Sequence, residues 1–239
     1  MVSTYILNLV SDLALLFPVF LLVFTFKGFF QALFARIAGD RTAQDEGFLT
    51  INPLVHIDIL GLLTVLVVLF ALGSILAGTI PRAFLFVLVV AFGARIGIPV
   101  PINENNFKHY KLGGILSALS GSLGNFVLSF LSILILRVII FSSLPKFAFI
   151  TLVKIFDSIV EISLLYGVLD LIPLPPFDGG KILKYIVPLK YSDAIAWLEE
   201  HSFFIVLLLF FIPGVSDVFF NFIMFSSSII KKIMLSMVF

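Results

Sequence analysis

The chain lacks cysteine altogether and has few charged residues. Without cysteine, a disulfide framework, a thiolate metal site and a cysteine nucleophile are all excluded. Charged residues make up 12% of the chain, whereas soluble domains have about 25%, so much of the polar surface of a soluble protein is missing. The formal net charge of +1 gives no basis for binding a polyanion, and nucleic acid is therefore not an expected partner.

The composition is instead rich in apolar residues. They make up 61% of the 239 residues, and the mean hydropathy is +1.21. A helix needs about 20 mostly apolar residues to cross a bilayer, and backbone in lipid must form helices or closed barrels. The apolar runs lack the alternation of barrel strands. The sequence thus predicts an all-α integral membrane protein with about six transmembrane helices, as a single domain over residues 1–239 in the lipid bilayer.

Two parts of this topology stay open in the sequence. Residues 83–98 form either a third span or a re-entrant piece, and the last apolar region, 203–239, is interrupted at Pro213-Gly214 and forms one segment or two. A short amphipathic piece with Lys181, Lys184 and Lys190 precedes that region. The other predicted spans are residues 13–38, 59–77, 112–141 and 147–171.

Lysine and arginine in the short loops predict the orientation, because they concentrate on the cytoplasmic side. The N-terminus is predicted to lie outside and the first helix to exit into the cytoplasm. The first helix is expected to be retained, since it lacks the basic region and small-residue cleavage site of a signal peptide. The cations that this orientation places inside are Arg36, Arg41, Arg95, Lys108, Lys111, Lys181, Lys184 and Lys190.

Four polar fragments stand out between the apolar runs. The combination of these fragments and their order along the chain is more informative about the protein family than any single fragment. They are Lys27-Gly28-Phe29-Phe30-Gln31, then Asn52-Pro53-Leu54-Val55-His56-Ile57-Asp58, then Gly121-Ser122-Leu123-Gly124-Asn125, and finally Asp170-Leu171-Ile172-Pro173-Leu174-Pro175-Pro176-Phe177-Asp178-Gly179-Gly180.

Together these fragments resemble the site-2 protease family of intramembrane zinc metalloproteases (peptidase M50), in its small form without a PDZ domain. The resemblance covers nearly the whole chain. It implies polar loops that dip toward an active site within the membrane, and a bacterial or archaeal plasma membrane. In active members, two histidines of a His-Glu-x-x-His helix hold zinc and the glutamate is the general base. An aspartate of the Pro-Pro-x-Asp-Gly phrase is the third ligand.

The chain departs from that pattern at three of the four functional positions. Lys27 and Gln31 stand at the two histidine positions, Gly28 stands at the position of the base, and only Asp178 is retained. A protonated lysine has no lone pair for a metal, and catalytic zinc takes three protein ligands. The expected site therefore holds no metal, no catalytic residue and no cofactor, although zinc is the cofactor of active members.

Lys27 lies within a predicted span, where a charge is costly unless it is paired or solvated. One interpretation is an ion pair with Asp178, in which the lysine occupies the vacated metal position and Gln31 bridges to the same carboxylate. Asp170 is a further candidate partner for Lys27. The other interpretation is that Lys27 extends into a water-filled pocket.

The resemblance also implies residues of a substrate cleft, and several have second interpretations. Asn125 either borders the cleft or packs two helices closely through small residues. His56 either forms loop hydrogen bonds or joins Asp170 and Asp178 in an improvised metal site. Asp157 and Glu161 lie on one helical face, near the outer boundary or along a cavity. The cleft candidates are Asn52, Pro53, His56, Asn125, Asp170 and Asp178.

Three functions are consistent with the sequence. The favoured one is a pseudo-protease that keeps the fold and binds a transmembrane helix of another protein without cutting it. The second is an active intramembrane metalloendopeptidase with a non-standard metal site. The third is a small transporter with a polar path through the membrane, although the inverted repeat of many transporters is missing.

Overall fold

The computed structural model describes residues 2–63, 67, 97–212 and 214–239. Among these residues the fold is helical and contains no strand, only an isolated antiparallel bridge between Ile57 and Gly97. The short helices are α2 (Thr42–Asp45), α3 (Pro53–His56), η1 (Glu104–Asn106), α8 (Asp178–Ile186) and η2 (Leu189–Tyr191). The long helices are α1 (Val2–Ala38), α6 (Tyr110–Ile140), α7 (Lys146–Asp170), α9 (Ser192–Phe211) and α10 (Val215–Val238).

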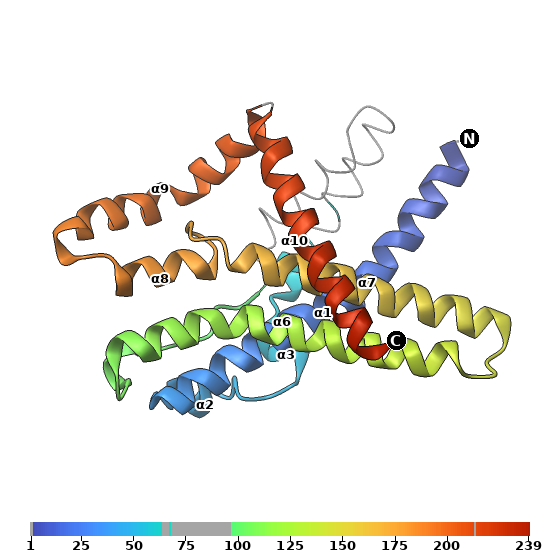
Figure 1. Cartoon of the computed structure of the whole chain (residues 1–239), viewed down its shortest axis with the longest axis horizontal. Coiled ribbons are helices and arrows are strands. Elements are labelled where there is room, and N and C mark those ends of the chain that lie inside the picture. The colour runs from blue at the N-terminus through green and yellow to red at the C-terminus, as the bar shows by residue number, and fades with distance from the viewer. Residues whose placement is uncertain (1, 64–66, 68–96, 213) are drawn as a thin grey trace.

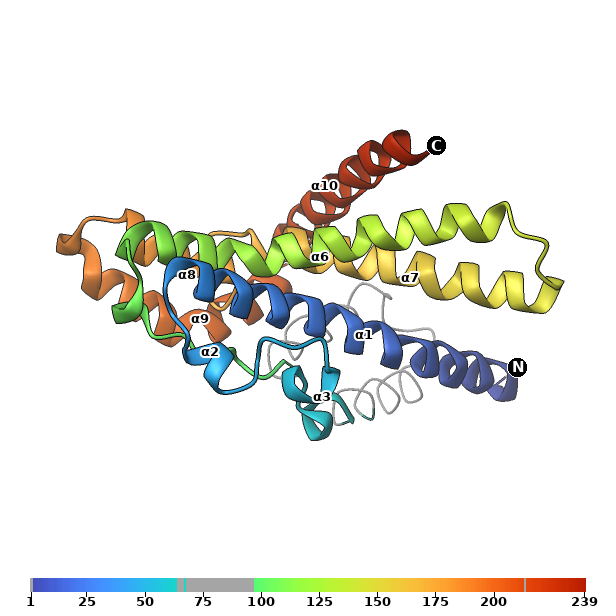
Figure 2. The same ribbon diagram turned by 90° about the horizontal axis from the view of Figure 1, so that it is seen from below.

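Helices α1, α6 and α7 run side by side along the length of the molecule (Figures 1 and 2). Helices α6 and α7 form an antiparallel pair joined through residues 141–145, and α1 packs along α6 and also contacts α7. Helix α10 crosses α7, and within the described part of the chain α9 packs against α10, α8 and η2 over small areas. The three-helix layer of α1, α6 and α7 therefore forms the centre of the described structure.

Small side chains let α6 approach its neighbours closely. Its buried residues include a series of glycines and serines in place of large apolar side chains, and helices in lipid pack through such small residues. This series runs Gly113, Gly114, Ser117, Ser120, Gly121, Ser122, Gly124, Ser129 and Ser132.

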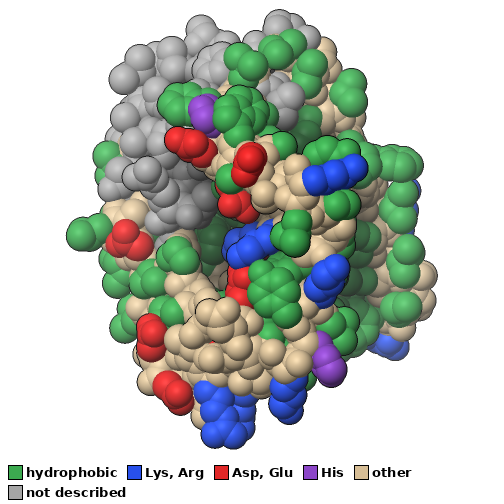
Figure 3. Space-filling model, turned by 90° about the vertical axis from the view of Figure 1, so that its left-hand side faces the viewer, with side chains coloured by type: hydrophobic (Ala, Val, Ile, Leu, Met, Phe, Trp, Pro, Cys, Tyr) green, Lys and Arg blue, Asp and Glu red, His purple; other side chains and the backbone are tan. Residues whose placement is uncertain are grey.

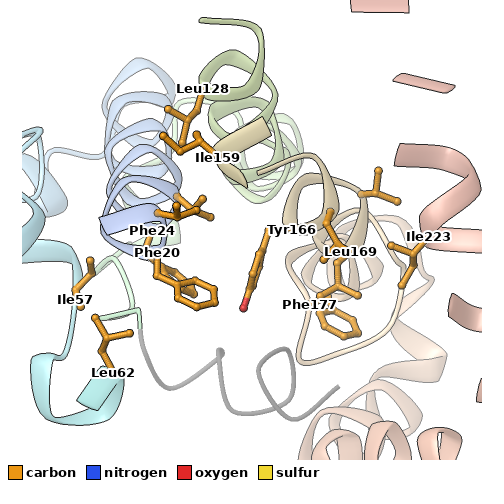
Figure 4. Close-up of a cluster of buried hydrophobic side chains, with 14 of the residues drawn as sticks. Phe20, Phe24, Ile57, Leu62, Leu128, Ile159, Tyr166, Leu169, Phe177 and Ile223 are labelled. Atoms are coloured by element: carbon orange, nitrogen blue, oxygen red, sulfur yellow. The ribbon is translucent and has the colours of Figure 1, made fainter. Parts of the chain in front are cut away.

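The main apolar core lies between α1 and α7 (Figure 4). Phe20 and Phe24 of α1 meet Tyr166 of α7 edge to face, with ring centroids 6.3 and 5.4 Å apart. Leu169 and Phe177 extend the same cluster toward the turn that follows α7. Burial of such rings removes a large apolar area from the surroundings, so the core fixes the end of α7 against the middle of α1.

The protein is a membrane protein with three helices that are long and apolar enough to span a bilayer, by length and composition, among the described residues. These segments are Ala14–Ala38, Tyr110–Ile140 and Val215–Val238. The first of these segments agrees with the predicted span at residues 13–38, and helix α1 itself extends back to Val2. The predicted spans at 59–77 and 83–98 lie almost wholly outside the described residues.

The last apolar region consists of two helices. Helix α9 ends at Phe211 and α10 begins at Val215, so the interruption at Pro213-Gly214 separates them. Gly214 has φ of 85°, in the left-handed region that favours glycine. Helix α9 begins at Ser192, well before the predicted apolar start at residue 203.

A buried carboxylate anchors the loops at the end of α1. Asp40 is fully buried and accepts four hydrogen bonds, from the backbone N–H (3.0 Å) and Oγ1 (2.6 Å) of Thr42, from the N–H of Asn103 (2.7 Å) and from Nδ2 of Asn106 (2.9 Å). Burial opposes ionisation, but these bonds outweigh it and lower the pKa of Asp40. The loop before α6 is thereby held against the end of α1.

Replacement of Asp40 by asparagine is expected to lower the free energy of unfolding by about 2–3 kcal/mol at pH 7, because hydrogen bonds to a charged group are lost. Because the pKa of Asp40 is lower in the folded protein, its ionised form stabilises the fold at pH values above the ordinary pKa near 3.9. This stabilisation disappears as the pH falls through the lower pKa of the folded state. Unfolding curves between pH 3 and 7 should show the two proteins converging in acid. Asp45→Asn, at an exposed site, is the control; a constant difference across this range would contradict the prediction.

Candidate functional site

Helix α1 places Lys27 and Gln31 one turn apart on the same face. Gln31 is buried, and the Lys27 side chain is 20% exposed. The face lies against α6, where the small residues leave room for polar side chains inside the helix layer. The two side chains thus enter the interior from the middle of a membrane-spanning helix.

The turn between α7 and α8 brings two aspartates to that face of α1. Asp170 is the last residue of α7, and Asp178 is the first residue of α8. The turn folds back tightly onto α8: a Cβ at Gly179 would lie 2.5 Å from the carbonyl oxygen of Ile172, and one at Gly180 would lie 2.3 Å from the nitrogen of Pro175. The two glycines of the Asp-Gly-Gly phrase are therefore required by close packing.

Lys27 lies between the two carboxylates. Its Nζ is 2.8 Å from Asp170 Oδ2 and 2.9 Å from Asp178 Oδ2. Gln31 Nε2 donates to the same Asp178 oxygen at 2.9 Å, and Lys181 Nζ is 2.6 Å from Asp178 Oδ1. The aspartate side chains are only 5% and 4% exposed. We call Lys27, Gln31, Asp170, Asp178 and Lys181 the ion cluster.

The formal charges of the ion cluster cancel, since two ammonium groups face two carboxylates. Burial disfavours the ionised form of Asp178, but attraction by Lys27 and Lys181 outweighs it and lowers the pKa of this carboxyl. A buried ion pair whose remaining polar atoms are also hydrogen-bonded is the arrangement in which attraction offsets desolvation. Lys27 and the two aspartates therefore form a charged group in the interior, and the fourth charge comes from Lys181 of α8, whose side chain is 61% exposed.

A cavity of about 350 Å³ borders the ion cluster, and its wall includes Phe24, Gly28, His56, Tyr166 and Leu169. A larger cavity of about 1040 Å³ lies between α6, α8 and α9, and shares Gln31, Val100, Ile102 and Lys181 with the first. Figure 3 views the molecule from the left-hand side of Figure 1 and shows a hollow bordered by lysine and acidic side chains. The two cavities are therefore neighbours, and Lys27 lines the smaller one.

The structure brings together three of the cleft residues predicted from the sequence. His56, Asp170 and Asp178 line the smaller cavity. Asn52 and Pro53 instead begin α3, where Asn52 Oδ1 accepts from the N–H of Leu54 at 3.2 Å in an exposed loop. They are not among the residues that line either described cavity.

Asn125 and the α7 acids lie away from these cavities. Asn125 is fully buried in α6, and neither atom of its amide has a hydrogen-bond partner among the described residues. Asp157 and Glu161 of α7 pair with Lys231 of α10, at 3.0 and 2.5 Å. This second charged group holds α10 against α7.

The side chains at the site do not fit a zinc ion. Lys27 Nζ lies within ion-pair distance of both carboxylates, where it repels a cation, and a protonated lysine has no free lone pair. The imidazole of His56 is engaged through Nε2, which is 2.8 Å from the Thr50 carbonyl oxygen. Across residues 2–63, 67, 97–212 and 214–239, no three His, Asp or Glu side chains are grouped to hold a metal.

Sequence reasoning missed two lysines of these clusters. Lys181 was assigned to an amphipathic piece, although its spacing of three residues after Asp178 on a helix allows an ion pair. Lys231 was not singled out at all. Its two partners are 70 and 74 residues away in the sequence, and no local pattern signals such a contact.

Comparison with known proteins gives one informative match. The chain is 30% identical over 193 residues to "Putative zinc metalloprotease YwhC" of Bacillus subtilis, and the aligned region covers 80% of this chain and 77% of that protein. No family model matches the chain. No solved structure matches it either.

Proposed function

This chain belongs to the zinc metalloprotease family that includes YwhC, and from that premise we propose that it is a pseudo-protease of the site-2 protease type. In this proposal it keeps the membrane fold and a cleft for a transmembrane segment of another protein, and it hydrolyses no peptide bond. The observation that carries the proposal is the position of Lys27, whose ammonium lies 2.8 and 2.9 Å from the two buried aspartates.

The chemistry of the remaining side chains supports the loss of hydrolysis. Gly28 cannot take a proton from water, and in the part of the chain that the structure describes His56 and the two aspartates are not grouped so as to hold a metal. Without a metal ion or a base there is no means of producing a nucleophile from water at neutral pH. The two cavities remain, so a bound segment can reach the ion cluster without being cut.

The proposal includes a membrane topology. About six spans, with the N-terminus outside, would place three basic parts on the cytoplasmic side of a bacterial or archaeal plasma membrane. These parts are α8, the C-terminal end of α1 and the N-terminal end of α6. Helix α7 would be one of these spans despite its charged residues, because Asp157 and Glu161 pair with Lys231 of α10.

Zinc content and proteolysis test the proposal together. Detergent-purified protein is expected to contain no zinc above background by elemental mass spectrometry, and Asp178→Ala is expected to give the same result. A transmembrane reporter substrate in liposomes should remain intact. Stoichiometric zinc that disappears in Asp178→Ala, with cleavage stopped by a chelator, would instead establish an active metalloprotease with a non-standard site.

A further inference from the structure

Two acidic residues lie on the exposed side of α7 at the depth of the membrane interior. The side chains of Asp157 and Glu161 are 53% and 54% exposed. Helix α7 begins at Lys146, and the helical rise places the two acids about 17 and 23 Å further along its axis. In the proposed topology these positions fall within the hydrocarbon core, which is about 30 Å thick. Acidic side chains at such a depth face protein or water and not lipid.

Lys231 of α10, the helix that crosses α7 (Figure 1), balances only one of the two acidic charges. Its Nζ is 3.0 Å from Asp157 and 2.5 Å from Glu161, so one ammonium faces two carboxylates. The neighbouring Lys232 is exposed and forms no ion pair within the described part of the chain. Lys154, also exposed, lies one turn before Asp157 on the same side of α7. This surface therefore presents charges of both signs.

Helix α10 continues the charged surface as a polar stripe beside Lys231. At about 100° per residue, the members of this stripe fall within about 60° of one another around the helix axis. They are all exposed, although α10 is apolar and long enough to span a bilayer. The polar stripe consists of Asp217, Asn221, Ser228 and Lys232. Because polar side chains of membrane helices find their partners on other helices, this side of α10 is suited to contact protein.

We propose that the surface formed by Asp157, Glu161 and the polar stripe binds a second copy of this chain, in a dimer whose two-fold axis runs along the membrane normal. Such an axis places equal residues at equal depth. Lys232 follows Lys231, which contacts both acids, so Lys232 of each copy lies at the depth of Asp157 and Glu161 of the other. A helix with charges of one sign would be repelled by part of this surface, whereas a second copy presents both signs.

The dimer is a property beyond the proposed pseudo-protease function, and it depends only on the proposed membrane topology. Single-molecule photobleaching of the dye-labelled whole chain in liposomes measures the dimer fraction over a range of protein-to-lipid ratios. Lys232→Gln is expected to weaken dimerisation about tenfold, because one substitution removes two symmetry-related contacts, each contributing about threefold. Lys232→Glu should weaken it further, since the new carboxylate faces Asp157 and Glu161. Lys190→Glu, the same charge change at an exposed site on η2, is the matched control and should leave dimerisation unchanged.

Cross-linking identifies the contacting side of α10, and the chain has no native cysteine to interfere. Ser228→Cys lies on the polar stripe, and Ile233→Cys lies about 140° away around the helix, where the isoleucine is 50% exposed. At low protein-to-lipid ratio, a short bismaleimide is expected to cross-link Ser228→Cys into a dimer and to leave Ile233→Cys monomeric. If the Lys232 variants give no folded peak in size-exclusion chromatography, these two exposed positions decide the question.

The outcomes separate this surface from other modes of association. A wild-type chain that stays monomeric at every protein-to-lipid ratio would overturn the inference, and a different membrane protein would then be the partner to seek. A dimer that cross-links through Ile233→Cys, or that is insensitive to both Lys232 substitutions, would place the interface elsewhere and overturn it as well. Neither result bears on the pseudo-protease, which zinc content and proteolysis test separately.

Discussion

Replacement of Lys27 by methionine is expected to destabilise the protein by about 3–5 kcal/mol, the usual cost of removing one partner from a buried ion pair. Methionine keeps most of the length and the apolar stem of lysine but carries no charge. The change leaves Asp170 and Asp178 buried with a net negative charge. Unfolding in detergent, followed by the fluorescence of Trp197 or by circular dichroism, measures the loss.

The two carboxylates should not respond equally to this change. Asp178 keeps Lys181 at 2.6 Å and Gln31 at 2.9 Å. For Asp170, Lys27 is the ion-pair partner in the described part of the chain, so its carboxylate loses that interaction entirely. A second substitution, Asp170→Asn, should therefore recover more stability in the Lys27→Met background than Asp178→Asn does.

A double-mutant cycle makes that comparison quantitative. The coupling between positions 27 and 170 is expected to exceed the coupling between 27 and 178, and Lys27→Arg should retain most of the stability because the charge remains. A Lys27→Met protein as stable as the wild type would show that the lysine extends into water and is not held by the aspartates.

Much of the ion cluster was predictable because its members occupy positions of the family's motifs. The pairing of Lys27 with Asp178, the bridge from Gln31 and the additional partner Asp170 were all proposed from sequence. In the structure, Lys27 Nζ is 2.8 Å from Asp170 and 2.9 Å from Asp178, and Gln31 Nε2 is 2.9 Å from Asp178. What the sequence left open was whether the lysine turns inward or toward water. Burial of both aspartates decides that geometry, and burial depends on packing that no local pattern contains.

The other outcomes of the sequence-based predictions also depend on whether a feature is local or arises from packing between helices. The sequence located the break at Pro213-Gly214, because proline and glycine interrupt helices locally. It also located the first span, predicted at residues 13–38 and found at Ala14–Ala38, although hydropathy did not show that α1 extends back to Val2. It also missed the pairing of Lys231 with Asp157 and Glu161. Helix boundaries and contacts between helices distant in sequence depend on tertiary packing, which overrides composition.

The geometry of the ion cluster also predicts that two substitutions restore a zinc site. Lys27 Nζ and Gln31 Nε2 both lie 2.9 Å from the same oxygen, Asp178 Oδ2. Side chains at positions 27, 31 and 178 therefore converge on one point, as three zinc ligands must. Lys27→His/Gln31→His is expected to bind one equivalent of zinc by elemental mass spectrometry.

Two further variants test whether Lys27 prevents zinc binding and whether Asp178 is needed as a ligand. Gln31→His alone should bind no zinc, because the Lys27 ammonium still occupies the position between the carboxylates. Adding Asp178→Asn to the double variant should abolish binding, since an amide replaces the carboxylate ligand. The zinc-loaded double variant should still cleave no substrate, because Gly28 supplies no base, and a glutamate there would have to displace His56. A double variant without zinc would mean that the backbone, as well as the side chains, has moved away from a metal-binding geometry.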